Sequence, residues 1–269
     1  MNRSPSQGTA NVNGTRIYYE SAGIGHPVVF IHGFTLDTRM WDSQFEYFAE
    51  QFHVLRYDVR GFGKSAVPTE ELYSHVEDLK SLLDHLAIKQ SYLIGQSMGG
   101  GIAIDFTLTY PEYVDALVLI DTALSGFDGS TEENARFALI WEEASRGGIP
   151  AAKASWLTHP FFTLAPSPRD VTARLAQIVE NYSGWHFVNE SHEHNLNLPA
   201  AQRLREITIP TLAIVGQHDV PDFLQITDLI GQEVPQVRKT IIPNVGHMSN
   251  MEAPEQVNRA IYEFFKGEL

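Results

Sequence analysis

The sequence contains no cysteine among its 269 residues. This absence excludes disulfide bonds, zinc sites built on thiolates and a cysteine nucleophile, and it is compatible with a reducing compartment. No apolar run approaches the roughly 18 residues that a membrane-spanning helix needs. The first ten residues also lack the apolar core of a signal peptide. We therefore expect a cytoplasmic protein that does not enter membranes.

Positive charge is scarce as well. Nineteen Lys and Arg residues face 33 Asp and Glu residues, which gives a formal net charge of −14. An acidic surface repels the phosphates of nucleic acids and of anionic lipids, so neither is an expected partner. Hydrophobic residues make up 43% of the chain, enough for a sizeable globular core. The length suits one large α/β domain or two small domains.

Short apolar runs alternate with helical patterns along most of the chain. The run at 27–31 is continuously apolar, which is typical of a strand buried on both faces. Between the runs, apolar residues recur with the spacing of amphipathic helices. The alternation predicts an α/β fold with a mostly parallel sheet and helices on both faces. The expected strands lie at 16–19, 27–31, 54–57, 92–94, 117–120, 212–215 and 240–242.

The alternation breaks between residues 124 and 207, where the patterns are helical and no strand is evident. The strand pattern then resumes. We interpret residues 124–207 as a helical lid, inserted after the strand at 117–120 into a core formed by residues 11–123 and 208–269. A separate downstream domain is the alternative, and the resumed strand pattern disfavours it. Residues 1–10 are expected to form a flexible tail.

A candidate nucleophile lies in the segment Gly95–Gly99, which reads GQSMG and fits the pattern G-x-S-x-G. The pattern is short, but here it follows an expected strand and opens an expected helix. That context predicts a sharp turn that holds Ser97 above the carboxyl edge of the sheet, where ligands bind in open α/β sheets. The alternative role for Ser97 is a helix cap.

A serine hydroxyl is a poor nucleophile without an adjacent base. His247 follows the last expected strand and therefore lies at the same edge of the sheet, so we predict it to be the base. His32 also follows a strand, but it precedes a glycine turn and is expected to be structural.

The base in turn needs a carboxylate that orients its ring and stabilises its charged form. Asp219 follows the strand at 212–215 and completes the order Ser, Asp, His along the chain. Asp222, in the same loop, and Asp121, at the end of an earlier strand, are alternatives. For Asp121 we expect that it ties down the entrance to the lid.

Two further pairs of residues are predicted around this triad. The backbone N–H groups of Phe34, in the loop after the first buried strand, and of Met98, after the nucleophile, are expected to form the oxyanion hole. The lid is rich in aromatic residues, which would exclude water and favour apolar groups. Trp141 in the lid and Met248 beside the predicted base are expected to line the substrate pocket.

Two other motifs are rejected. The segment Gly61–Ser65 ends like a phosphate-binding loop, but position 58 is Asp where that loop needs Gly. The pair His192 and His194 has no evident third metal ligand. We therefore expect neither a metal site nor a cofactor.

In this order, the motifs resemble the α/β-hydrolase superfamily. Within it, Leu36–Trp41 and Arg56–Gly61 are similar to segments of 3-oxoadipate enol-lactonases and small carboxylesterases. Haloalkane dehalogenases and epoxide hydrolases also resemble the chain, but they place Asp at the position of Ser97. Meta-cleavage C–C hydrolases typically follow His-Gly with Gly-Pro-Gly, whereas this chain has Phe34-Thr35-Leu36.

The resemblance implies an α/β-hydrolase fold and a serine hydrolase that cleaves a small-molecule carboxylic ester or lactone through an acyl-enzyme, with no cofactor. Two alternatives stay open. The same triad serves C–C bond hydrolases and perhydrolases. Some hydrolase-like proteins instead use the pocket as a receptor for a small ligand.

Overall fold

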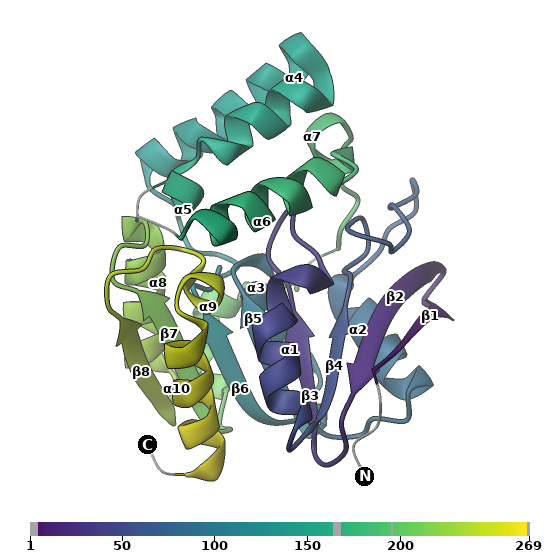
Figure 1. The fold of residues 1–269 in the computed structure, drawn as a ribbon, viewed down its shortest axis with the longest axis vertical. Helices are drawn as coiled ribbons and strands as arrows, with labels where there is room; N and C mark the ends of the chain where they lie inside the picture. Colours follow the sequence, from purple (N-terminus) through teal and green to yellow (C-terminus); the bar gives the residue numbers. More distant parts are fainter. Residues whose placement is uncertain (1–4, 164–167, 195, 268–269) are drawn as a thin grey trace.

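A computed structural model describes residues 5–163, 168–194 and 196–267. Within them, eight strands form one sheet in the order β1-β2-β4-β3-β5-β6-β7-β8 (Figure 1). The pairs β1–β2 and β2–β4 are antiparallel, and all other neighbours are parallel. The strands are β1 (Ser6–Val12), β2 (Thr15–Ala22), β3 (Pro27–Ile31), β4 (His53–Tyr57), β5 (Ser91–Gln96), β6 (Val114–Ile120), β7 (Thr211–Gly216) and β8 (Val237–Ile242).

The central strands are buried on both faces. Every residue of β7 is buried, as are all but one residue each of β3, β5 and β6. Such burial stabilises the sheet in proportion to its apolar area, by roughly 25 cal/mol per Å². The predicted α/β fold with a mostly parallel sheet is therefore confirmed.

Helices cover both faces of the sheet. In Figure 1, α1 and α10 lie in front of the strands, and α2 and α3 lie behind them. Because β4, β3, β5, β6, β7 and β8 run in parallel, the loops that follow them meet at one edge. The core helices are α1 (Asp42–Ala49), α2 (His75–His85), α3 (Met98–Thr109), α8 (Pro221–Glu233), α9 (Ser249–Glu252) and α10 (Pro254–Lys266).

The first residues differ from the sequence-based expectation. Ser6–Val12 is strand β1, paired antiparallel with β2, where we expected a flexible tail over residues 1–10. Residues 1–4 of that expected tail lie outside the described residues. Its residues are mostly exposed and polar, and Ala10 is the buried one. An edge strand of this kind is held by backbone hydrogen bonds rather than by apolar burial, so its sequence carries little hydrophobic signal.

The chain between β6 and β7 forms a helical segment comprising α4 (Thr131–Leu157), α5 (Pro160–Thr163), α6 (Arg169–Asn181) and α7 (Trp185–Val188). It lies above the carboxyl ends of the strands (Figure 1). The helix α4 is kinked at Gly148, whose φ is 69°, just before Pro150. That this segment acts as a movable lid stays a prediction.

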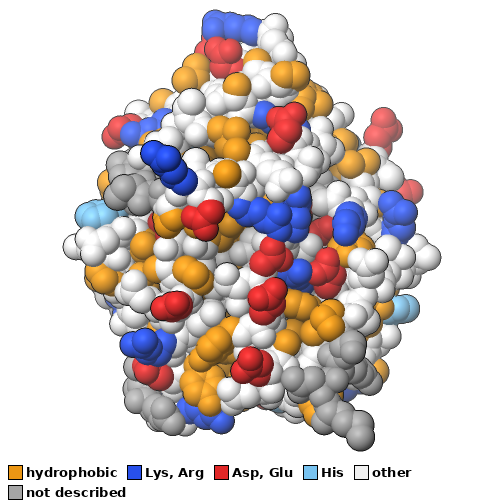
Figure 2. Space-filling model, in the orientation of Figure 1, with side chains coloured by type: hydrophobic (Ala, Val, Ile, Leu, Met, Phe, Trp, Pro, Cys, Tyr) orange, Lys and Arg blue, Asp and Glu red, His pale blue; other side chains and the backbone are white. Residues whose placement is uncertain are grey.

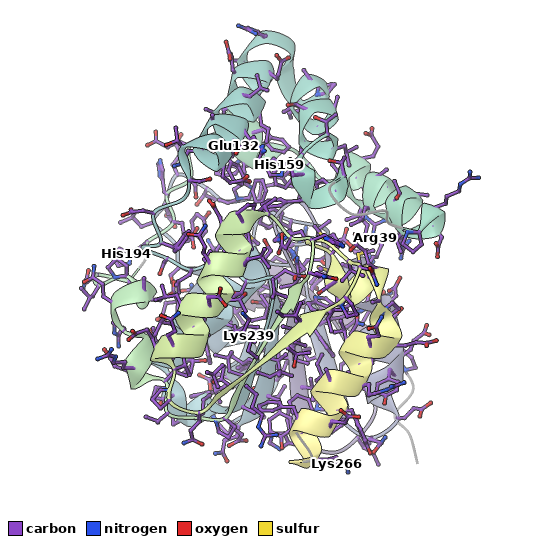
Figure 3. The ribbon with its side chains drawn as sticks, turned by 90° about the vertical axis from the view of Figure 1, so that its left-hand side faces the viewer. Arg39, Glu132, His159, His194, Lys239 and Lys266 are labelled. Atoms are coloured by element: carbon purple, nitrogen blue, oxygen red, sulfur yellow. The ribbon has the colours of Figure 1, made fainter. Side chains whose placement is uncertain are left out.

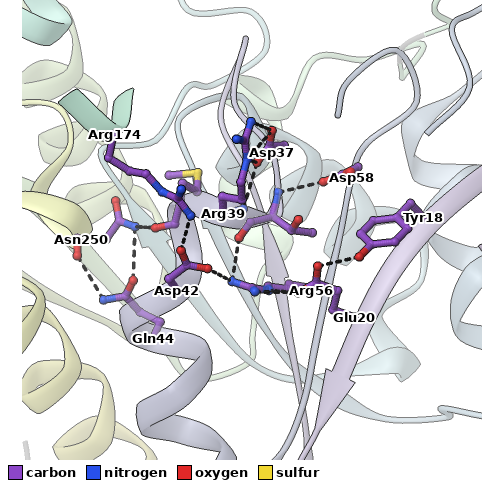
Figure 4. A network of polar contacts seen from close by, with 12 residues as sticks. Tyr18, Glu20, Asp37, Arg39, Asp42, Gln44, Arg56, Asp58, Arg174 and Asn250 are labelled. Atoms are coloured by element: carbon purple, nitrogen blue, oxygen red, sulfur yellow. Dashed lines mark hydrogen bonds and ion pairs between the residues drawn. The ribbon is translucent and has the colours of Figure 1, made fainter. Parts of the chain in front are cut away.

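An ion pair and a hydrogen bond join the helical segment to the core. Arg174 of α6 contacts Asp42 of α1 (Figure 4). Arg39 donates a 3.0 Å hydrogen bond to Oδ1 of Asn181 in α6. Figure 2, in the orientation of Figure 1, shows positively and negatively charged side chains gathered across the middle of the molecule, where α6 lies above α1. Among the described helices, none has both the length and the apolar character to cross a bilayer.

Candidate active site

Ser97 lies in the sharp turn between β5 and α3. Its backbone has φ 51° and ψ −120°, a conformation that residues with side chains rarely adopt. Such strain costs of order 1–3 kcal/mol and persists only where the surroundings impose it. The turn lifts the serine side chain above the edge of the sheet, as the G-x-S-x-G motif predicts.

The glycines of the motif allow the close packing that imposes this turn. A Cβ atom at Gly95 would clash with the carbonyl of Gly99, and a Cβ atom at Gly99 would clash with the carbonyl of Ile31 in β3. Any larger residue would therefore push α3 away from the sheet.

Ser97, His247 and Asp219 form one hydrogen-bonded chain. The Oγ of Ser97 lies 3.0 Å from Nε2 of His247, and Nδ1 of His247 lies 3.0 Å from each carboxylate oxygen of Asp219. Because Asp219 accepts at Nδ1, that nitrogen carries the proton and Nε2 is free to accept one from the serine hydroxyl. The arrangement matches the geometry of a serine nucleophile with its base and orienting acid.

The electrostatic surroundings tune the imidazole of His247. Burial disfavours its charged form, but the charge of Asp219 and the hydrogen bond to it outweigh burial, so the pKa of His247 is raised above its usual value. Both side chains are almost fully buried. A base with a raised pKa and little contact with water is suited to taking a proton from a hydroxyl.

Two neighbouring aromatic rings pack against the imidazole of His247. The ring of Phe161, from α5, stacks on His247 with centroids 4.0 Å apart and planes 20° from parallel. Phe223, from α8, meets it edge to face at 4.3 Å. The orientation of His247 is therefore set by apolar packing as well as by Asp219. The sequence analysis did not single out either ring for this role.

The two alternative carboxylates have other partners. Asp121 accepts hydrogen bonds from the backbone N–H of Gly216 and from the N–H and hydroxyl of Ser249. It joins the ends of β6 and β7 to the loop that carries His247. Asp222 accepts from the N–H of Ser130, just before α4.

This corrects the expectation for Asp121. The carboxylate that ties down the entrance to the helical segment is Asp222, because its loop, and not the end of β6, reaches the start of α4. Asp121 is fully buried, and burial and the nearby charge of Asp219 raise its pKa well above the usual range.

The predicted oxyanion donors lie beside Ser97. Phe34 and Met98 line the same cavity as Ser97, and neither N–H is hydrogen-bonded within the described part of the chain. Phe34 follows β3, whereas Met98 opens α3, so its amide is one of the free donors at a helix start. The two N–H groups are therefore available to an anionic oxygen.

The loop that carries Phe34 is fixed from two directions. On the core side, Asp58 accepts from the N–H of Thr38, and Arg56 donates to the Thr38 carbonyl and to Asp42 (Figure 4). From α4, the indole of Trp156 donates to the hydroxyl of Thr35. Arg56 and Asp58 belong to the segment that carried the resemblance to enol-lactonases, so that motif supports the loop.

His32 is structural, as expected. Its Nδ1 donates to the carbonyl of Gly33 at 2.8 Å, and its Nε2 accepts from the N–H of Val59 at 2.9 Å. Both ring nitrogens are engaged and the side chain is fully buried. Burial lowers the pKa of His32, so it stays neutral and joins the loops after β3 and β4.

A cavity of about 640 Å³ is lined in part by Ser97. Trp141 and Met248, which we expected in the pocket, both line it, although Trp141 is also 41% exposed. The wall near Ser97 is mostly apolar. The large apolar residues that line the cavity are Phe34, Leu36, Phe62, Met98, Ile102, Leu124, Phe137, Trp141, Trp156, Phe161, Phe223 and Met248.

The sequence analysis missed the other end of this cavity. Asp105, Glu190 and Glu193 line it together with His75 and His186. A partial signal existed for Asp105, because residues seven and eight positions apart share a helix face. For the other four residues, only the path of the chain brings them to the cavity.

The pair His192 and His194 does not form a metal site. His194 lies at the outer side of the molecule (Figure 3), and Nδ1 of His192 is hydrogen-bonded to the carbonyl of Glu70. The same view places His159 beneath α4, where its Nε2 lies 2.9 Å from Glu133. Across residues 5–163, 168–194 and 196–267, no three His, Asp or Glu side chains are arranged to hold a metal ion.

Comparison with known proteins agrees with this architecture. The chain is 29% identical to a putative 2-succinyl-6-hydroxy-2,4-cyclohexadiene-1-carboxylate synthase of Bacillus subtilis, over 96% of this chain and 98% of that protein. It is 25% identical to 3-oxoadipate enol-lactonase 2 of Acinetobacter baylyi, over 89% and 88% of the two chains. An esterase structure from Thermogutta terrifontis superposes with a TM-score of 0.75 at 25% identity, covering 98% of this chain and 99% of that one.

These relatives confirm the predicted resemblance to enol-lactonases and esterases. The model of the α/β-hydrolase fold family matches residues 26–254, which is most of the chain. The chain is therefore a member of the α/β-hydrolase family.

Proposed function

We propose that this chain is a serine hydrolase that cleaves carboxylic esters or lactones, with Ser97, His247 and Asp219 as its catalytic triad. The observation that carries the proposal is the unbroken chain of 3.0 Å contacts from Ser97 through His247 to Asp219. It supports acyl transfer because all three groups face a cavity or each other in the order that serine catalysis requires.

The proposed reaction has two halves. The Oγ of Ser97 attacks the ester carbonyl while His247 takes the hydroxyl proton, and the N–H groups of Phe34 and Met98 stabilise the oxyanion. The C–O bond to the alcohol then breaks, and His247 returns the proton to the leaving oxygen. Water, deprotonated by His247, attacks the acyl-enzyme; the carboxylic acid leaves and the proton returns to Ser97.

The cavity does not favour an anionic substrate. The activity named for the Bacillus subtilis relative involves a carboxylate, and an anionic group of that kind is usually held by Arg or Lys. Among the described residues that line the cavity there is no Arg or Lys. A neutral ester or lactone fits the apolar wall better.

The test compares wild type with Ser97→Ala on 4-nitrophenyl acetate and butyrate. We expect the variant to lose more than about 10³-fold in kcat/KM. Ser43→Ala, at an exposed position of α1, is the matched control and should keep full activity. Equal, feeble rates in wild type and Ser97→Ala would overturn the proposal and favour the C–C hydrolase or receptor alternatives.

A further inference from the structure

The end of the cavity away from His247 carries negative charge without a matching cation. Three carboxyl side chains, those of Asp105, Glu190 and Glu193, line the cavity, and its described lining includes no Lys or Arg. The charge of Arg203 attracts that of Asp105, but the Arg203 guanidinium donates its hydrogen bonds to Glu206 and to the carbonyl of Leu108.

The two histidines at this end do not compensate the charge. Burial lowers the pKa of His75 to about 3 and that of His186 to about 4, so both are neutral at physiological pH. The Nε2 of His75 lies 3.7 Å from Glu193. Its side chain is 4% exposed, and within the described chain its Nδ1 has no hydrogen-bond partner. A polar group that is buried and unpartnered is costly unless a ligand satisfies it.

The helix α3 connects this end to the nucleophile. Met98, Gly101, Ile102 and Asp105 form one face of α3, and all four line the cavity. At 1.5 Å per residue, Asp105 lies roughly 10 Å along the helix from Met98. Gly101 leaves this face open, because a Cβ there would meet no atom closer than 3.6 Å.

The loop that carries Glu193 is held in place by the core. The N–H of Tyr73 donates to the carbonyl of His192, and the N–H of His194 donates to the carbonyl of Tyr73. These two bonds flank Glu193 and place its side chain against His75. Backbone hydrogen bonds therefore fix the position of Glu193 at the acidic end of the cavity.

The direction of the reaction decides which part of a substrate reaches this end. His247 must protonate the leaving alcohol, so the alcohol lies on the His247 side of Ser97. The acyl chain is then the part that extends along α3 toward Asp105.

We propose that the cavity selects acyl groups by charge: Asp105 and Glu193 bind a positively charged or hydrogen-bond-donating end of the acyl chain and exclude a carboxylate. This inference rests on the proposed ester hydrolysis. It narrows the substrate class to esters and lactones whose acyl chain is neutral or cationic at its far end.

The test uses three 4-nitrophenyl esters that differ only in the end of the acyl chain. They are the hexanoate, the 6-(trimethylammonio)hexanoate and the mono-ester of adipic acid. At pH 8, we expect kcat/KM to fall in the order cationic, neutral, anionic, with the cationic and anionic esters differing by roughly 100-fold. The double variant Asp105→Asn/Glu193→Gln should reduce that ratio by about tenfold or more, chiefly through KM.

The matched control is Glu46→Gln/Glu112→Gln, which removes the same charge from exposed positions and should keep the wild-type ratio. If the anionic ester is cleaved as fast as the cationic one, or if the control changes the ratio as much as the cavity variant, the inference is wrong. In those cases Ser97-dependent cleavage of the hexanoate would leave the proposed function standing. If wild type does not cleave the hexanoate in a Ser97-dependent way, both the proposed function and this inference are wrong. Should the double variant not fold, Glu193→Gln alone must lower the ratio.

Discussion

The indole N–H of Trp156, in α4, donates a 2.7 Å hydrogen bond to the hydroxyl of Thr35, 121 residues earlier in the chain. That hydroxyl in turn donates to the carbonyl of Phe34 at 2.6 Å. Thr35 has a φ of 64°, which is unusual for a β-branched residue. The helical segment thus helps to hold the strained loop that presents the proposed oxyanion donor.

Trp156→Phe should lower kcat because it removes the indole donor and loosens the loop around Phe34. The loss of one hydrogen bond corresponds to about 0.5–1.5 kcal/mol, or roughly 2- to 13-fold in kcat, with a smaller change in KM. Trp185→Phe is the control, since that indole packs edge-on against His186 instead. Steady-state kinetics with 4-nitrophenyl butyrate measure both. An unchanged kcat in Trp156→Phe would show that the loop holds its shape without α4.

Phe161→Leu should change the pH dependence of the reaction. Burial lowers the pKa of His247, opposing Asp219, and the stacked ring of Phe161 supplies part of that burial. With the ring gone, the pKa of His247 should rise. Since only neutral His247 accepts a proton, the acid limb of the kcat/KM profile should move to higher pH.

The control for this variant is Phe162→Leu, the neighbouring residue in α5, which packs on Trp156. It should leave the acid limb in place. If the acid limb of the kcat/KM profile does not move in Phe161→Leu, or moves to lower pH, Phe161 does not position and shield His247.

The triad geometry could be predicted from sequence because each member follows a strand of a parallel sheet. Such strands end at one edge, so Ser97, Asp219 and His247 had to converge once the strand pattern was recognised. The glycines of the G-x-S-x-G motif and the order of Ser, Asp and His along the chain identified which residues these are.

The remaining features depend on contacts that no local pattern encodes. The polar strand β1 is specified by pairing with β2 rather than by hydrophobic alternation. The roles of Asp121 and Asp222 depend on which loop lies over the start of α4. Glu193 reaches the cavity only because its loop pairs with Tyr73, about 120 positions earlier in the chain.

Asp219→Asn and Asp121→Asn should distinguish the proposed catalytic role of Asp219 from the structural role of Asp121. Asp219→Asn should lower kcat by about 10³–10⁴-fold, because an amide no longer fixes the tautomer of His247 or stabilises its charge. Asp121→Asn should keep kcat within about tenfold but lower the free energy of unfolding by roughly 1–2 kcal/mol, since the amide nitrogen cannot accept from Ser249.

Urea unfolding and steady-state kinetics measured on the same preparations make this comparison. Burial and the charge of Asp219 raise the pKa of Asp121 and so favour its neutral form, which is why a neutral amide should change kcat little. The reverse pattern, with Asp121→Asn inactive and Asp219→Asn active, would transfer the orienting role to Asp121.

The proposed preference for cationic acyl chains should depend on pH. Burial raises the pKa of Glu193 to about 7, assisted by the charges of Asp105 and Asp78, and burial raises the pKa of Asp105 to about 6. The other titratable groups at Glu193 are His75, which is neutral, and Tyr73, whose pKa is raised further by burial. Well below pH 6 both carboxyls are protonated, and well above pH 7 both are charged.

The ratio of kcat/KM for the 6-(trimethylammonio)hexanoate to that for the hexanoate should therefore increase as the pH rises from 5.5 to 8.5, with most of the change near pH 7. Titration of His247 affects both esters alike, so it cancels in the ratio. In Glu193→Gln the remaining change should shift toward pH 6, where Asp105 titrates. A ratio that is flat across this range in wild type would mean that neither carboxyl meets the acyl chain, even if the enzyme cleaves both esters.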